Sequence, residues 1–229
     1  MGMMERCPTG IVGFDKICQG GFVRNSSNVL IGGPGSGKST FLLQFLWNGA
    51  TKFNENGLYC SFEPDIVETF KDASMFGWDF TSLNEQERVK FLRLSPSTSI
   101  GDLRAELTKL VAKYDIRRIC FDPVSAMILT QNEGSKVREI LFDLVSLMNR
   151  LNVTTILSDE ADEDSEGKIG SRTDVIKFLT DSVTTLHSSG LSGVGDRAVR
   201  VIKMRRTNHS RGPVGMQISG KGIEVLPEA

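Results

Sequence analysis

The most informative segment of the sequence is Gly32-Gly33-Pro34-Gly35-Ser36-Gly37-Lys38-Ser39. Two of its glycines are separated by four residues and followed directly by Lys and Ser, which is the pattern of a loop that wraps phosphate groups. Residues 28–31 before it predict a buried strand. Apolar side chains at helical spacing after it predict a helix from Lys38 to Trp47 that ends at Asn48-Gly49. Strand, glycine-rich loop and helix in this order are the arrangement that phosphate binding requires.

The residues of this loop have distinct expected roles. Glycine lets the backbone approach a phosphate closely, and the N–H groups of Gly35 to Ser39 would gather at the positive end of the helix. Lys38 would reach the β- and γ-phosphates and act in catalysis, and the Ser39 hydroxyl would ligate Mg²⁺. The sequence therefore predicts that a nucleoside triphosphate and Mg²⁺ are bound, and that the nucleotide contacts Gly33, Pro34, Gly35, Ser36, Gly37, Lys38, Ser39 and Thr40.

A second part of the expected metal site lies at the end of another apolar run. Residues 117–122 predict a strand that ends in Asp122. A strand that ends in aspartate is common, but downstream of a phosphate loop it fits the second magnesium-binding element of such enzymes. We therefore expect Ser39 and Asp122 to share the metal ion.

The composition is that of a globular protein without a strong charge bias. The 229 residues are 39% hydrophobic and 24% charged, with a net charge of −1, so no overall field attracts nucleic acid or an anionic membrane. We see no repeat and no linker, and we expect one domain over residues 1–229. The N-terminus lacks the apolar core of a signal peptide and the apolar runs are only strand-length, so we expect a cytoplasmic protein that does not contact membranes. The cysteines show no metal-ligand spacing and are expected to be buried free thiols: Cys7, Cys18, Cys60 and Cys120.

Strands and helices alternate along the chain. Besides residues 28–31, strands are predicted at 57–62, 89–94, 117–122, 153–157, 182–186 and 198–204, and a closing hairpin at 216–219 and 222–226. Helices are predicted at 38–47, 64–76, 99–113 and 137–151. Apolar strands that alternate with helices favour a mainly parallel sheet covered on both faces, a three-layer α/β/α architecture with a C-terminal antiparallel hairpin. The nucleotide is expected at the carboxyl ends of the strands.

Several further segments carry a family pattern. They are Pro8-Thr9-Gly10-Ile11 with Phe14-Asp15, Gly20-Gly21, the phosphate loop, Leu43-Gln44-Phe45-Leu46, the strands before Glu63 and Asp122, and Arg197-x-Val199-x-Val201-x-Lys203-x-Arg205-x-x-x-His209. In this order and over nearly the whole chain, the sequence resembles the KaiC-like branch of the RecA/RadA-type ATPases, above all its single-domain, largely archaeal members. The resemblance implies a RecA-like P-loop NTPase fold and Mg²⁺-dependent ATP hydrolysis. It also implies a homo-oligomer, with a hexameric ring favoured, whose active sites lie between subunits. The preference for adenine comes from the resemblance alone.

The resemblance also implies roles for single residues. Glu63 matches the first of two adjacent carboxylates that polarise the attacking water, and Pro64 takes the place of the second, which puts efficient hydrolysis in doubt. Lys203 and Arg205 match catalytic cations that reach across a subunit interface to the γ-phosphate of the neighbour, and alternation along the strand would put both on one face. His209 matches a position near the neighbouring nucleotide. Without the resemblance, a solvated strand end is the favoured interpretation of these cations.

Two other functions remain open. Pro64 favours an ATP-gated assembly or partner-binding module with little hydrolysis, its protein partner unknown. A RadA paralogue that modulates recombination through single-stranded DNA is the other alternative. The resemblance implies that DNA would bind at loops following the fourth and fifth strands, as in RecA-type relatives. The residues do not favour this, because the second of these loops begins with an acidic run at 158–166, and the bases beyond it (Lys168, Arg172, Lys177) have no interleaved aromatic residues. Lys177 and Phe178 replace the Ser-Thr pair that is phosphorylated in circadian KaiC, so autophosphorylation there is not expected.

Overall fold

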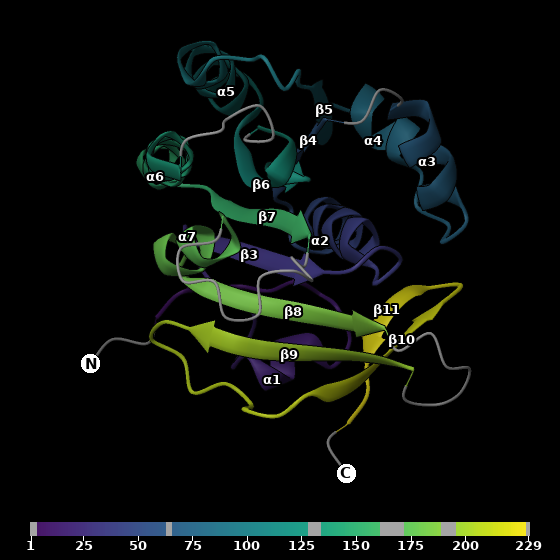
Figure 1. Cartoon of the computed structure of the whole chain (residues 1–229). Coiled ribbons are helices and arrows are strands. Elements are labelled where there is room, and N and C mark those ends of the chain that lie inside the picture. The colour runs from purple at the N-terminus through teal and green to yellow at the C-terminus, as the bar shows by residue number, and fades with distance from the viewer. Residues whose placement is uncertain (1–3, 63–65, 128–133, 161–171, 189–195, 228–229) are drawn as a thin grey trace.

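The computed structural model describes residues 4–62, 66–127, 134–160, 172–188 and 196–227. Within these residues one large sheet is built from β3 (Ser27–Gly32), β4 (Asn56–Ser61), β5 (Val89–Arg93), β6 (Ile116–Asp122), β7 (Thr154–Glu160), β8 (Ser182–Ser188), β9 (Arg197–Met204), β10 (Val214–Ser219) and β11 (Gly222–Val225). Its strand order is β11-β10-β9-β8-β3-β7-β6-β4-β5 (Figure 1). A separate antiparallel pair joins β1 (Arg6–Cys7) to β2 (Phe22–Val23).

The sheet is mainly parallel, as the sequence predicts. From β8 to β5 each neighbouring pair runs parallel. Only β9, β10 and β11 pair in antiparallel fashion, and the last two form the predicted C-terminal hairpin. Because β3, β7 and β6 are adjacent and parallel, their carboxyl ends meet at one edge of the sheet, where the phosphate loop begins.

Helices cover both faces of the sheet, which confirms the three-layer prediction (Figure 1). One face is covered by α2 (Lys38–Lys52), α3 (Ile66–Ser74) and α4 (Phe80–Glu85), with α1 (Phe14–Ile17) packed nearby, and the other by α5 (Ile100–Tyr114), α6 (Gly134–Leu151) and α7 (Arg172–Leu179). A short 3₁₀ turn, Val124–Met127, follows β6. Each face has its own core of buried apolar side chains. In the described part of the chain, none of the helices combines the length and apolar character that a membrane crossing demands.

The helix after the phosphate loop is longer than predicted. It continues past Asn48-Gly49 to Lys52, so the expected stop was wrong. Asn48 is buried and its Nδ2 donates to the Thr9 carbonyl at 3.0 Å. A Cβ at Gly49 would lie 2.6 Å from Cδ of Arg118. Both residues therefore serve packing inside the helix, where tertiary contacts override their usual preference for helix ends.

Other differences concern short or peripheral elements. The sequence pattern predicts no element at β1, β2, α4 or α7, which are too short to show a clear period. The predicted cap of α5 is confirmed, because the Ser99 side chain accepts from the amide of Asp102 at 3.1 Å. The predicted start of α3 at Pro64 lies outside the described residues.

Candidate nucleotide-binding site

The glycine-rich loop joins the end of β3 to the start of α2, as predicted. Gly35 and Gly37 have φ angles of 69° and 100°, which L side chains rarely adopt. A Cβ at Gly37 would also lie 2.8 Å from Cδ1 of Ile218. Both the φ angle and the lack of space therefore require glycine at this position. Gly37 is the N-cap of α2 and has no side chain to bond the first amides of the helix. Those amides therefore suit an anion.

Lys38 lies over this loop. Its Nζ donates to the carbonyl oxygens of Gly32, at 2.7 Å, and Gly33, at 3.0 Å. Next to it on α2, Ser39 is exposed and Thr40 is half-buried. Lys38 therefore presents its charge at the mouth of the loop, where a phosphate oxygen would lie.

A cavity of about 230 Å³ adjoins the loop on the side of β8. Its walls come from the loop and the end of β8: Ile31, Gly32, Gly33, Pro34, Ser36, Thr185, Leu186, His187 and Ser188. The Ser36 hydroxyl is buried and has no hydrogen-bond partner within the described residues. A buried hydroxyl of this kind is usually bonded in a folded protein, so it fits a loop that bonds a ligand.

Asp122 is held rigidly beside the loop. It is the last residue of β6 and is buried. One carboxylate oxygen accepts from the Tyr59 hydroxyl at 2.5 Å, and the other accepts from the hydroxyl of Ser158. Only β7 separates β6 from β3. The predicted pairing of Asp122 with the phosphate loop is thus consistent with the strand order.

The donors present fit magnesium. Ser39 and Asp122 offer hydroxyl and carboxylate oxygens, which Mg²⁺ prefers, and Mg²⁺ usually takes only one or two protein ligands beside phosphates and water. Among the described residues, no three His, Cys, Asp or Glu side chains gather as a metal site. An ion between Ser39 and Asp122 would therefore depend on phosphate oxygens and water for the rest of its ligands.

Several residues near the loop were missed by sequence reasoning. Arg197, at the start of β9, donates through Nη1 to the Gly35 carbonyl at 2.5 Å. Tyr59 and Ser158, which fix Asp122, are polar residues inside apolar strands, and that was the available signal. Ser158 was predicted to begin an acidic loop, which was wrong, because β7 continues to Glu160. Ser158 and Asp159 are buried within the sheet; residues 161–166 lie outside the described part of the chain.

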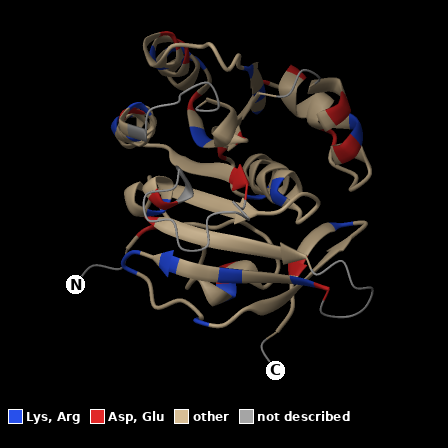
Figure 2. Cartoon of the chain, in the orientation of Figure 1, with Lys and Arg blue, Asp and Glu red and all other residues tan. Residues whose placement is uncertain are grey.

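The two expected trans-acting cations lie far from this loop. β9 runs antiparallel to β8, so that Met204 pairs with Ser182 at the start of β8 and Arg197 pairs with Ser188 at its end. Lys203 therefore lies at the edge of the sheet opposite to the chain's own phosphate loop. Figure 2 shows Lys and Arg gathered at this end of β9.

The end of β9 departs from strict alternation. Val199, Val201 and Met204 are buried, and the pairing with β8 shifts register next to Lys203. This irregularity turns Lys203 away from the core face that Val201 occupies. Its Nζ instead donates to two carbonyls at the end of α7, those of Lys177 and Thr180, each at 2.6 Å.

The surroundings of Lys203 are partly desolvated and positive. Burial lowers its pKa below the ordinary value, and the charge of Arg205 adds to this shift. Arg205 is exposed, with Nη1 3.6 Å from a carboxylate oxygen of Asp181 and Nη2 donating to the Phe178 carbonyl at 3.3 Å. His209 follows in the next segment, with Nδ1 2.9 Å from the Ser210 carbonyl oxygen. The structure therefore brings none of the three to the chain's own loop, and Glu63 lies outside the described residues.

Comparisons with known proteins agree with this architecture. A family model described as "ATPase: KaiC" matches residues 7–229. The chain is 33% identical over 233 residues to the circadian clock oscillator protein KaiC of Thermostichus vulcanus, and 30% identical over 233 residues to that of Prochlorococcus marinus strain MIT 9313. Each match covers 98% of the chain but only 44% and 46% of the relatives, so the chain spans less than half their length. The crystal structure of a KaiC-like protein from Pyrococcus horikoshii OT3 matches with a TM-score of 0.86 and 29% identity, over 98% of this chain and 100% of that one.

Proposed function

The chain belongs to the KaiC family of ATPases, and from this premise we propose that it binds ATP with Mg²⁺ and hydrolyses it at sites shared between subunits of a homo-oligomeric ring. One observation carries the proposal. The phosphate loop, with Lys38 over its carbonyls, lies one strand away from Asp122, whose carboxylate two hydroxyls hold in place.

Each group would have a distinct part in binding. The amides of the loop and of the first turn of α2 would hold the β- and γ-phosphates, and Lys38 would exchange its carbonyl partners for phosphate oxygens. Tyr59 and Ser158 would keep the Asp122 carboxylate from rotating. Mg²⁺, when bound near Ser39 and Asp122, would neutralise charge that builds up on the phosphates.

The proposed water-polarising acid is Glu63, on the strength of the family resemblance. With Pro64 in the place of the second acid, the chain offers one carboxylate where the pattern has two. We expect a slow turnover as a consequence. Slow turnover also leaves room for the second candidate, an ATP-gated assembly module, which Pro64 specifically favours. Within the part of the chain that the structure describes, no feature favours single-stranded DNA as a ligand.

The direction of β9 supports a shared site. Lys203 lies six residues beyond Arg197 on β9, and at about 3.3 Å per residue their Cα atoms are about 20 Å apart. Arg197 contacts the chain's own loop. A lysine side chain cannot bridge that separation, so Lys203 and Arg205 can serve only the nucleotide of another subunit. There they would stabilise charge on the transferred phosphoryl group, as an arginine finger does.

Three measurements test the proposal. Calorimetric titration with ATP and Mg²⁺ should give at least about tenfold weaker binding for Lys38→Ala than for the wild type, because charged hydrogen bonds to phosphate are lost. Equal affinities would remove the loop from nucleotide binding. Native mass spectrometry with and without ATP and Mg²⁺ should show an oligomer; a monomer in both conditions would exclude shared sites. Turnover that Glu63→Gln leaves unchanged would exclude Glu63 from the mechanism.

A further inference from the structure

We propose that Glu160 is a second catalytic carboxylate, which accepts a proton from the attacking water and replaces the acid that Pro64 cannot supply. The inference rests on the proposed ATPase function and deepens it. Its grounds are the position, direction and exposure of Glu160 at the carboxyl end of β7.

The register of the sheet places Glu160 at the phosphate loop. β7 lies between β3 and β6, and the Cα of Glu160 pairs with that of Gly32. Gly32 is the residue whose carbonyl accepts from Lys38 at 2.7 Å. Two residues earlier on β7, Ser158 bonds Asp122. Glu160 is therefore flanked by the loop on one side and by the expected metal ligand on the other.

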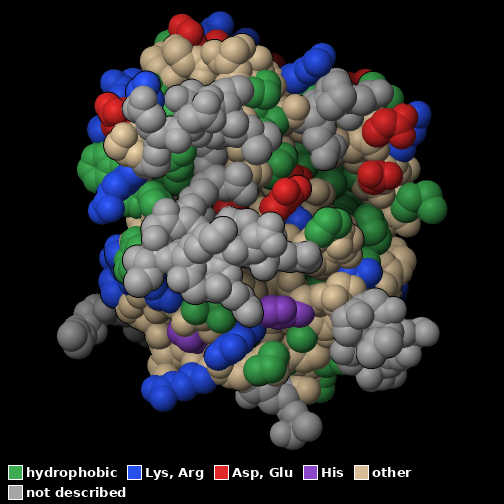
Figure 3. Space-filling model, in the orientation of Figure 1, with side chains coloured by type: hydrophobic (Ala, Val, Ile, Leu, Met, Phe, Trp, Pro, Cys, Tyr) green, Lys and Arg blue, Asp and Glu red, His purple; other side chains and the backbone are tan. Residues whose placement is uncertain are grey.

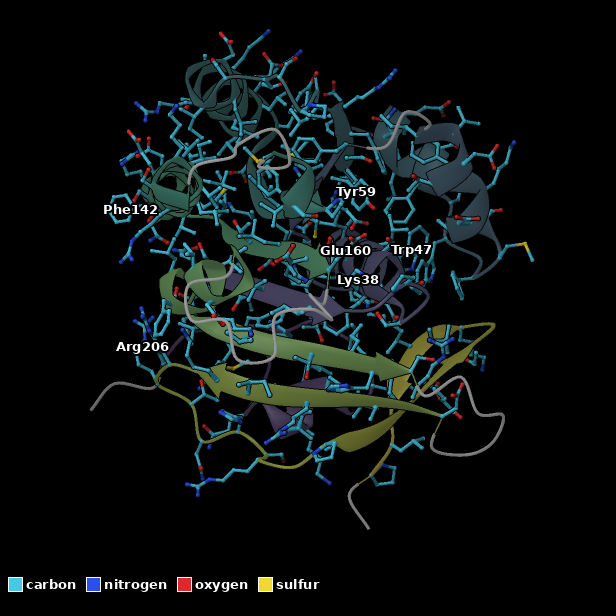
Figure 4. All side chains as sticks on the ribbon, viewed as in Figure 1. Lys38, Trp47, Tyr59, Phe142, Glu160 and Arg206 are labelled. Atoms are coloured by element: carbon cyan, nitrogen blue, oxygen red, sulfur yellow. The ribbon has the colours of Figure 1, made fainter. Side chains whose placement is uncertain are left out.

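The alternation of β7 sets the direction of the side chain. Ile156 belongs to the core on the side of α2, and Ser158 faces Asp122, so Glu160, two residues on, projects to the same side. Lys38 opens α2 on that side. Figure 4 shows Glu160 and Lys38 close together in the middle of the view. Figure 3 shows acidic side chains exposed near the middle of this face of the molecule.

Glu160 is the one residue of β7 that reaches solvent. Thr154 to Asp159 are buried, whereas Glu160 is exposed. Its carboxylate forms no ion pair or hydrogen bond within the described part of the chain. An exposed acid costs binding energy next to a triphosphate unless it contacts water or a cation. A role in holding water fits this placement better than a role in holding phosphate.

The chemical step balances with water and ATP alone. As the water oxygen bonds to the γ-phosphorus, the water proton passes to the Glu160 carboxylate. The bond from the γ-phosphorus to the bridging oxygen breaks, and its electron pair stays on the terminal oxygen of ADP. The carboxylic acid then releases the proton to solvent, which restores the carboxylate.

The test compares Glu160→Gln with Glu139→Gln, which removes an exposed acid from α6. Phosphate release and ATP affinity are measured for both variants and the wild type, and the pH dependence of kcat for all three. Glu160→Gln should lower kcat at least about 100-fold, because general base catalysis contributes about that much. It should bind ATP as tightly as the wild type or more tightly, and it should lose the acid limb of the kcat profile. Glu139→Gln should match the wild type throughout.

Other outcomes would contradict a catalytic role for Glu160. A kcat for Glu160→Gln within about twofold of wild type, with wild-type turnover present, would overturn the role of Glu160 and leave the ATPase proposal intact. A parallel loss of kcat and ATP affinity, with the acid limb kept, would make Glu160 only a positioning partner of Lys38. Absence of any turnover in the wild type would overturn both the role of Glu160 and the proposed ATP hydrolysis. Nucleotide binding at the phosphate loop would still stand in that case if the wild type binds ATP and Lys38→Ala does not.

Discussion

Mixing two inactive variants tests the shared site directly. Lys38→Ala removes the cation of the phosphate loop and leaves the end of β9 intact. Lys203→Met removes a cation at the end of β9 and leaves the phosphate loop intact. Each variant alone should lose at least about 100-fold in turnover, because a charged contact to the transferring phosphoryl group is worth that much. Together they should recover activity, since a loop from one subunit can meet Lys203 of another.

The expected recovery follows from the geometry of a ring. If equal amounts assemble at random, a site works only where a Lys203→Met subunit, with an intact loop, meets a Lys38→Ala subunit, with an intact Lys203. This happens at about one quarter of the interfaces for any ring size, because the two neighbours are drawn independently. Phosphate release by the mixture should therefore reach about a quarter of the wild-type value, many times the sum of the separate variants.

The assay needs a control for folding, because Lys203 also bonds two carbonyls at the end of α7. Arg206→Met is a matched variant: Arg206 is exposed and contacts the Asp181 carboxylate at 3.5 Å. It should keep wild-type turnover. Thermal unfolding of Lys203→Met should show a loss of about 1 kcal/mol at most, the value of a cation at a helix end. A mixture that forms mixed rings, shown by mass spectrometry, yet stays as inactive as its components would refute the shared site.

Two further predictions concern stability and thiol chemistry. Glu55 bonds Arg118 at 2.6 Å and Arg24 at 2.7 Å; burial alone would raise its pKa, but the Arg118 charge and both hydrogen bonds hold it below the usual range. The resulting stabilisation should be complete above about pH 5 and should be lost as the pH falls through about 4.3 to the lowered pKa. Urea unfolding of the wild type should show this loss of stability. Glu55→Gln should lower the free energy of unfolding by about 3–5 kcal/mol at neutral pH and should not show this acid dependence. All four cysteines are buried free thiols, and burial raises the pKa of Cys7 to about 11 and that of Cys18 to about 12. A thiol reagent at neutral pH should label none of them until the protein unfolds, and labelling of the native protein would contradict this burial.

The sequence was most informative where one short segment determines both structure and chemistry. The phosphate loop needs glycine at positive φ angles and Lys38 at the first turn of a helix, so its conformation is encoded locally. The end of β6 at Asp122 could be predicted because the apolar run of the strand stops there. Both predictions needed no knowledge of which strands are neighbours.

The remaining features depend on pairings between distant segments. Glu160 could not be placed from the sequence, because its partner Gly32 is set by the strand order and register of the finished sheet. The polarity of Ser158 and Asp159 predicts a loop for the run that contains it, although both residues are buried in the sheet. Asn48-Gly49 predicts a helix end, because the close approach of Gly49 to Arg118 of β6 cannot be recognised from the local sequence. The turn of Lys203 likewise depends on an irregularity in the β8–β9 pairing that alternation cannot reveal.

The polarity of the sheet links these observations to assembly. Parallel strands deliver the loop, Asp122 and Glu160 to one edge, whereas the antiparallel β9 delivers Lys203 and Arg205 to the opposite edge. Under the proposed mechanism, a single chain would therefore carry the phosphate-binding and metal-binding groups and would lack the cations on the far side of the γ-phosphate. In the isolated chain those cations bond the end of α7 and Asp181. Under the proposed mechanism they must exchange these partners for phosphate oxygens, so ring closure and nucleotide occupancy would be coupled in free energy.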